Sequence, residues 1–295
     1  MIQATSTLHQ MPPGVDSHAH VFTKSLPLAA GRRYAPVNDA TLDTYRKLLD
    51  EHDIGNAVLV QPSFLGTDNS YLLKALANDR MRLRGVAVVS TDISDTDLIN
   101  MSSQGVTGVR LNLVGQALPD ISTTPYATLW KKLSKIGWHV ELHREASNLA
   151  PLIRPLLDAG LPVVVDHFGR PDPDQGICDP GFKELLKFGT SGRVWVKVSG
   201  VYRCTKPGSN FVTEATDQLI NAFGAERMMW GSDWPHTQYE RDIDFGQTLS
   251  TLLGLNIERS IIDTILRTTP YLFYGFDRDS ESANSQSESP SQFIF

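Results

Sequence analysis

Four histidines and one aspartate occur at the ends of short apolar runs, where their side chains could act together in chemistry. His18 and His20 end the first run, His143 and His167 end two later runs, and Asp233 follows the last. A carboxylate beside imidazoles can take a proton from water, and the same residue types can hold a divalent metal. Ordinary protein cores rarely bury so many ionisable side chains. We therefore interpret these residues as one catalytic cluster.

The runs that carry these residues share one design, a short Val-rich segment followed by a helix-like pattern. From His18 to Asp233 the mean step is about 31 residues, close to the length of one βαβ unit. The runs do not alternate between apolar and polar residues, which is typical of parallel strands buried on both faces. Eight such units predict an α/β fold, the (β/α)8 TIM barrel, whose chemistry lies at the carboxyl ends of the strands. Because residues two apart on a strand share a face, His18 and His20 can both face that mouth.

Composition and charge limit the remaining possibilities. We expect a loose leader over residues 1–13, a single catalytic barrel over 14–276 and a Ser-rich, disordered tail over 277–295, because the tail has no apolar core. No apolar run reaches the roughly 18 residues of a membrane span, and the first residues lack the pattern of a secretory signal. With only two cysteines, a cytoplasmic protein is expected. A net charge of −6 without a basic stripe argues against nucleic acid as a partner.

The motifs around the cluster resemble the amidohydrolase superfamily, and most closely its lactonase branch, which acts on pyrone dicarboxylates and sugar lactones. The resembling segments are Val15–Phe22, Arg32–Pro36, Gln61–Asn69, Gly108–Asn112, Gly137–Val140, Asp166–Asp172, Val194–Ser199 and Trp230–His236. The resemblance implies a hydrolase that opens a lactone of the pyrone, muconolactone or aldarate type with water. Asp233 would be the general base, and His18, His20 and His167 would surround the scissile carbonyl. Fixed donors there would meet the negative charge that develops on the carbonyl oxygen.

Three arginines follow strand ends, and the resemblance places each where lactonases hold a substrate carboxylate. They are Arg110, Arg170 and Arg203. The guanidinium fork matches the geometry of a carboxylate. Tyr34 and Ser63 also fall on substrate-contact positions. We therefore expect a small anionic lactone as the substrate.

His143 leaves the metal question open. It stands where pyrone-dicarboxylate lactonases have a tyrosine, which implies a contact with substrate. With His18, His20 and Asp233 it also completes the mononuclear ligand set of metal-dependent amidohydrolases, and this set suits zinc. The expected cofactor is therefore either none or one divalent metal, with zinc preferred. His236, three residues after Asp233, could orient that carboxylate or contact the substrate.

Two other functions compete with the lactonase. One is a zinc-dependent decarboxylase of an aromatic or unsaturated acid, which the same superfamily contains, and the other is a barrel that only binds a ligand. The motifs DHFGRPD and WGSDWPH together favour the lactonase. An arginine that pyrone-dicarboxylate lactonases have near Gln116 is absent, which weakens the case for that particular dicarboxylate. The sequence leaves open the exact substrate and whether the chain forms a homodimer.

Overall fold

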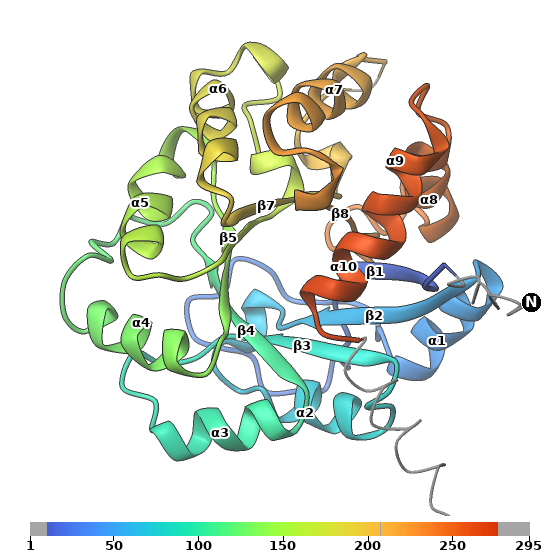
Figure 1. The fold of residues 1–295 in the computed structure, drawn as a ribbon. Coiled ribbons are helices and arrows are strands. Elements are labelled where there is room, and N and C mark those ends of the chain that lie inside the picture. Colours follow the sequence, from blue (N-terminus) through green and yellow to red (C-terminus); the bar gives the residue numbers. More distant parts are fainter. Residues whose placement is uncertain (1–10, 207, 277–295) are drawn as a thin grey trace, which may run out of the picture.

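The computed structural model describes residues 11–206 and 208–276, and its centre is one sheet of eight strands (Figure 1). The strands follow one another in chain order, and every neighbouring pair is parallel. They are β1 (Gly14–Ala19), β2 (Ile54–Val60), β3 (Leu83–Ala87), β4 (Val106–Asn112), β5 (His139–His143), β6 (Val163–Val165), β7 (Val194–Val198) and β8 (Met228–Trp230). The predicted (β/α)8 barrel is confirmed.

The barrel closes between β1 and the loop that follows β8. Ala19 and Trp234 form a parallel bridge. The backbone N–H of His20 donates to the carbonyl of Trp234, and that of Asp233 donates to the carbonyl of His18, both at 2.8 Å. The histidine pair and the aspartate are therefore joined by one hydrogen-bonded seam.

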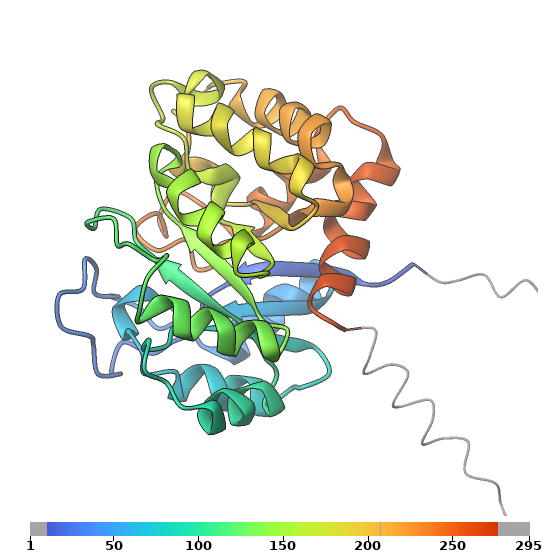
Figure 2. The same ribbon diagram turned by 60° about the vertical axis from the view of Figure 1, so that its left-hand side comes forward.

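Helices surround the barrel and bury one face each against it (Figures 1 and 2). They are α1 (Leu42–Glu51), α2 (Ser70–Ala77), α3 (Asp95–Ser103), α4 (Tyr126–Lys135), α5 (Ala150–Asp158), α6 (Pro180–Leu186), α7 (Phe211–Phe223), α8 (Phe245–Leu253), α9 (Arg259–Asp263) and α10 (Thr269–Phe273). Ser94 caps α3, because its side chain accepts from the backbone N–H of Asp97 at 3.0 Å. Gly137 and Gly160 follow α4 and α5 with φ values of 71° and 81°. Glycine adopts this left-handed conformation without the steric strain that a Cβ atom would cause.

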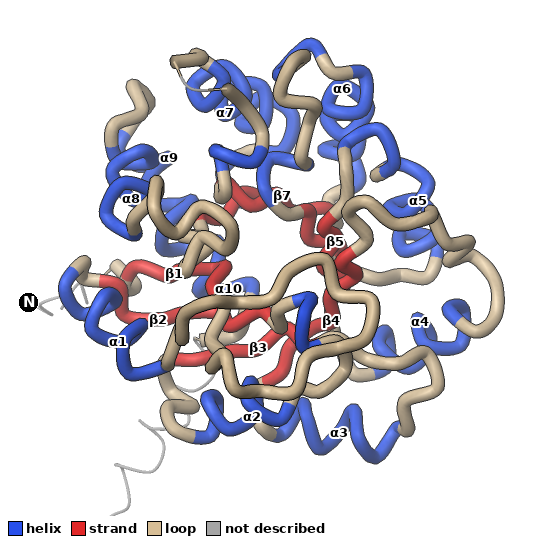
Figure 3. Tube along the Cα trace, turned by 180° about the vertical axis from the view of Figure 1, so that it is seen from behind, coloured by secondary structure: helices blue, strands red, loops and turns tan. Residues whose placement is uncertain are grey.

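The end of the barrel opposite the site is packed with apolar side chains. Valines and a methionine from five strands form a cluster with Tyr274 and Phe276, which follow α10. In Figure 1, α10 lies in front of this end, whereas Figure 3 shows from behind the loops that cross the other end.

The rest of the domain prediction lies largely outside the described residues. Residues 1–10 and 277–295, which cover most of the expected leader and all of the expected tail, are not described. Among the helices of the described ranges, none combines the length and apolarity needed to cross a membrane.

Candidate active site

The structure brings the sequence-predicted residues together at the mouth of the barrel. A cavity of about 110 Å³ is lined by His20, Tyr34, Ser63, Arg110, His143, His167, Arg170, Arg203 and Asp233, together with Arg33 and Asn112. His18 lies just beneath the cavity and is fully buried. His236 does not line it, and its Nδ1 lies 3.3 Å from the hydroxyl oxygen of Tyr202.

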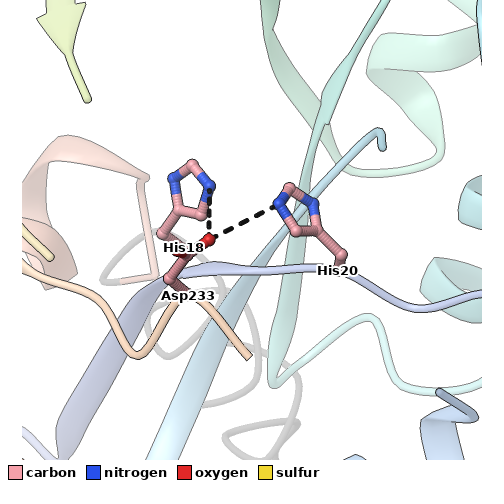
Figure 4. A group of neighbouring side chains, drawn as sticks. All are labelled: His18, His20 and Asp233. Carbon is pink, nitrogen blue, oxygen red and sulfur yellow. Dashed lines mark ion pairs between the residues drawn. The ribbon is translucent and has the colours of Figure 1, made fainter. Parts of the chain in front are cut away.

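Asp233 presents its two carboxylate oxygens to different surroundings. Oδ1 lies 3.8, 3.8 and 3.9 Å from the Nε2 atoms of His18, His20 and His167. Figure 4 shows the first two rings pointing toward this oxygen. Oδ2 accepts hydrogen bonds from Nε of Arg203 and from the hydroxyl of Tyr202, both at 2.7 Å. One oxygen is thus held in place and the other faces the imidazoles.

The charge of Arg203 keeps Asp233 ionised. Burial by itself would raise the pKa of Asp233, but the guanidinium of Arg203 holds that pKa well below the usual range of an aspartate. Asp233 is therefore a carboxylate at neutral pH and can accept a proton at Oδ1.

His20 faces Asp233 with a lone pair. Its Nδ1 lies 2.7 Å from the carbonyl oxygen of Val60, which can only accept, so Nδ1 carries the proton. Burial, followed by the charge of Arg110, lowers the pKa of His20 to about 4, so its Nε2 is unprotonated at neutral pH. Two electron-rich atoms, Nε2 of His20 and Oδ1 of Asp233, then face each other at 3.8 Å. A water that donates to both, or a cation, fits between them.

The same reasoning makes this place suitable for a divalent metal. Ligand atoms of His18, His20 and Asp233 all lie within 4.8 Å of one another. Nε2 of His18 is buried and has no hydrogen-bond partner among the described residues. Its pKa is well below the ordinary value, first because of burial, so the ring is neutral as a metal ligand must be.

His143 lies outside this group of possible ligands. Its Nδ1 is 3.1 Å from Nη2 of Arg110, and its Nε2 is 3.0 Å from Nη1 of Arg170. A neutral imidazole has one lone pair in the ring plane, so only one of these contacts can be a hydrogen bond. The mouth therefore has more hydrogen-bond donors than acceptors around His143, and an anionic ligand would supply the missing acceptors.

The three predicted arginines differ in their partners. Arg110 donates through Nε and Nη2 to Oδ2 of Asp166 at 3.1 and 2.8 Å, and Arg203 is paired with Asp233. Arg170 has no carboxylate within 4 Å among the residues that the structure describes. Of the three, Arg170 is thus the one whose charge is left for a ligand.

A layer of buried charges lies directly below the site. Lys197 donates to Glu141, and its Nζ is 3.1 Å from Nδ1 of His18. Asp166 places Oδ1 3.3 Å from the same nitrogen, and Arg110 completes a set of two basic and two acidic side chains. Burial raises the pKa of one of the acids, Glu141, to about 7. If Nδ1 of His18 carries the proton, it can donate to Asp166, and Nε2 has a lone pair for a metal. If Nδ1 instead accepts a hydrogen bond from Lys197, Nε2 carries the proton and can donate it.

The loops that carry the site are held by specific bonds. Asp16 accepts from the hydroxyl of Tyr45 at 2.7 Å and from the backbone N–H of Ser232 at 2.8 Å, which fixes the loop before Asp233 against β1. His167 and Asp233 themselves have positive φ values of 51° and 60°. Such backbone strain in residues other than glycine persists where the surrounding structure enforces it, and it clusters at functional sites.

Comparison with known proteins identifies the family. The family model for amidohydrolases matches residues 15–276. The chain belongs to the amidohydrolase family. A crystal structure from Pseudomonas putida, assigned as a 2-pyrone-4,6-dicarboxylic acid hydrolase, is 45% identical with a TM-score of 0.84, over 91% of this chain and 99% of that one.

Two further relatives of this amidohydrolase have names from the same branch. The 2-pyrone-4,6-dicarboxylate hydrolase of Comamonas testosteroni is 32% identical over 77% of this chain and 78% of its own length. The 4-sulfomuconolactone hydrolase of Hydrogenophaga intermedia is 30% identical over 78% of this chain and 77% of its own length. The resemblance to the lactonase branch is confirmed.

Sequence reasoning missed several residues of the site. Glu141 and Lys197 are charged residues inside apolar strands, each two positions before a polar residue at the carboxyl end of its strand, His143 and Ser199. That spacing puts them on the same strand face and could have indicated a buried ionic layer. Tyr202, by contrast, stands in a loop where no pattern in the sequence indicates its bond to Asp233.

Proposed function

We propose that this protein is a lactonase that opens the ring of a small anionic lactone with water, using Asp233 as general base. One observation carries the proposal. At the base of the cavity, an ionised carboxylate oxygen faces three imidazoles that are neutral because burial lowers their pKa values, that of His167 to about 3. The cavity wall also contains the guanidinium of Arg170, which has no carboxylate partner among the described residues. Relatives named as hydrolases of pyrone dicarboxylates and sulfomuconolactones support a lactone as the substrate.

The geometry suggests how the nucleophile is positioned. A water that donates one hydrogen to Nε2 of His20 and the other to Oδ1 of Asp233 directs its lone pairs away from both. As the water oxygen bonds to the lactone carbonyl carbon, its proton passes to Oδ1 of Asp233. His20 acts here as an acceptor. This differs from the sequence hypothesis, which grouped it with the residues that polarise the carbonyl.

The carbonyl oxygen then needs a donor. His167 and His18 are the candidates, because each can carry a proton on Nε2. Nδ1 of His167 lies 2.9 Å from the hydroxyl oxygen of Ser199, which can donate to it, and Nδ1 of His18 lies beside the ammonium of Lys197. When the tetrahedral intermediate collapses, the ring C–O bond breaks and the leaving oxygen takes the proton back from Asp233.

His18, His20 and Asp233 would hold a divalent metal if the protein uses one. Such a metal supplies a bound water with a lowered pKa and polarises the carbonyl. Arg170, supported by His143, would hold an anionic group of the substrate, and Ser63 and Tyr34 lie on the rim of the same cavity.

A panel of lactones tests the proposal. The purified protein is mixed with pyrone, muconolactone and aldarate-type lactones, with and without chelator, and acid release is followed beside CO2 release from a hydroxybenzoate. We expect acid release from an anionic lactone and no CO2. CO2 release from the hydroxybenzoate without acid release from any lactone would identify the decarboxylase alternative. If neither class of substrate is turned over, the alternative of a barrel that only binds a ligand would be favoured.

A further inference from the structure

We infer that Arg33 determines substrate specificity, by holding together with Arg170 an anionic group of the substrate that is remote from the scissile carbonyl. The inference rests on the lactonase function proposed above. It adds a contact from a segment that the chemistry itself does not require.

Arg33 lies in the long connection between β1 and α1, which passes across the mouth of the barrel (Figure 3). The connection is fastened at two sides of the mouth. Nη2 of Arg33 donates to Oδ1 of Asn112, at the end of β4, at 3.0 Å. The neighbouring hydroxyl of Tyr34 donates to Glu240, in the loop after β8, at 2.6 Å. These bonds keep the guanidinium of Arg33 on the cavity wall.

The guanidinium of Arg33 has donors to spare. Arginine has five N–H donors, and the bond to Asn112 uses one of them. Within residues 11–206 and 208–276, no carboxylate oxygen lies within 4 Å of Arg33. The nearby Glu145 is already paired, with Oε2 3.1 Å from Nε of Arg144.

The charges around the cavity are unbalanced, and a bound anion would balance them. Arg110 and Arg203 are neutralised by carboxylates of the site, whereas Arg33 and Arg170 have no carboxylate partner in the part of the chain that the structure describes. The pKa of Arg33 is lowered, first by partial burial and then by the charges of Arg170 and Arg110. Both guanidinium groups line the same cavity, so a carboxylate or sulfonate between them would relieve their repulsion.

The test compares Arg33→Met with Arg32→Met. Arg32 is the matched control, because it is adjacent and exposed and does not line the cavity. The substrates are 2-pyrone-4,6-dicarboxylate and its two monocarboxylates. A charged hydrogen bond is worth roughly 1.5–3 kcal/mol, and the exposure of Arg33 favours the lower end. We expect Arg33→Met to lose about tenfold in kcat/KM on the dicarboxylate, mainly through KM. On the monocarboxylate without the remote group it should stay within about twofold of wild type, and Arg33→Lys should recover part of the loss.

Two results would overturn the inference while leaving the lactonase intact. These are unchanged kinetics of Arg33→Met, or equal losses on all three pyrones. If the wild-type protein opens no lactone, the proposed function fails separately, and citrate binding measured by calorimetry then decides on Arg33. Weaker citrate binding by Arg33→Met than by Arg32→Met and wild type supports the anion contact. Equal affinity of all three, or no binding by the wild type, removes it.

Discussion

Replacement of Asp233 by asparagine separates chemistry from folding at this site. The substitution keeps the shape of the side chain and removes the proton acceptor. Its amide oxygen can take the place of Oδ2, where Arg203 and Tyr202 donate. Its NH2 group then takes the place of Oδ1 and points a donor at the lone pair of His20. The variant should fold, because the amide oxygen keeps the bonds from Arg203 and Tyr202.

The expected loss is large because the position of the acceptor becomes that of a donor. Loss of a general base typically costs about 10²–10⁴-fold in rate, which corresponds to roughly 2.7–5.4 kcal/mol in the activation barrier. The loss should appear in kcat for lactone opening. Some stability should also be lost, since Arg203 keeps a buried charge without its carboxylate, and thermal unfolding measures this effect.

Asp242→Asn is the matched control for Asp233→Asn. Asp242 is an exposed aspartate in the same loop, and its side chain makes none of the contacts that hold Asp233. Asp242→Asn should keep wild-type kcat. A folded Asp233→Asn variant that turns over at a near-normal rate would refute the assignment of Asp233 as the base.

Three further predictions follow from the charges of the barrel. Arg203→Met should lower kcat and move the acid limb of the kcat/KM profile to higher pH, because Asp233 must be ionised and its pKa rises without the guanidinium; an unmoved limb would contradict this. Lys197→Met should lower the free energy of unfolding by about 3–5 kcal/mol in denaturant titration, because Glu141 loses the nearer of its two buried basic partners and keeps only Arg110 at 3.5 Å. Adding Glu141→Gln should restore part of that loss. Burial lowers the pKa of His139 to about 3. Between about pH 6.5 and pH 3, His139 is therefore protonated in the unfolded state and neutral in the folded state. His139→Phe should therefore reduce the slope of unfolding free energy against pH in this window by about 1.4 kcal/mol per unit, and an unchanged slope would count against the shift.

The fold and the position of the cluster were predictable because they depend on local patterns. Val-rich runs at a steady spacing specify buried parallel strands, and the chemistry of such a barrel lies at one end of them. His18, His20 and Asp233 end their runs at the same end of the barrel, so the sequence predicts that they meet. The seam of backbone hydrogen bonds between β1 and the loop after β8 confirms their proximity.

The partners of these side chains could not be predicted in the same way. The tautomer of His20 depends on a carbonyl of Val60 on the neighbouring strand, and this contact is set by strand stagger. The resemblance to lactonases assigned the same role, contact with a substrate carboxylate, to Arg110, Arg170 and Arg203. In the structure two of them are paired with carboxylates, and the pairing depends on which side chains share one level of the barrel interior.

The buried ionic layer explains how the site can have neutral histidines and ionised carboxylates side by side. Desolvating Arg110, Glu141, Asp166 and Lys197 is costly, and only close pairing of the opposite charges offsets that cost. Burial raises the pKa of Glu141 to about 7, so the layer is neutral when Glu141 is ionised and carries one positive charge when Glu141 is protonated. An anion bound at the mouth is therefore not repelled by the layer, and it is attracted by Arg33 and Arg170, which have no carboxylate partner among the described residues. A local field of this kind can attract an anionic substrate although the chain as a whole carries a net charge of −6.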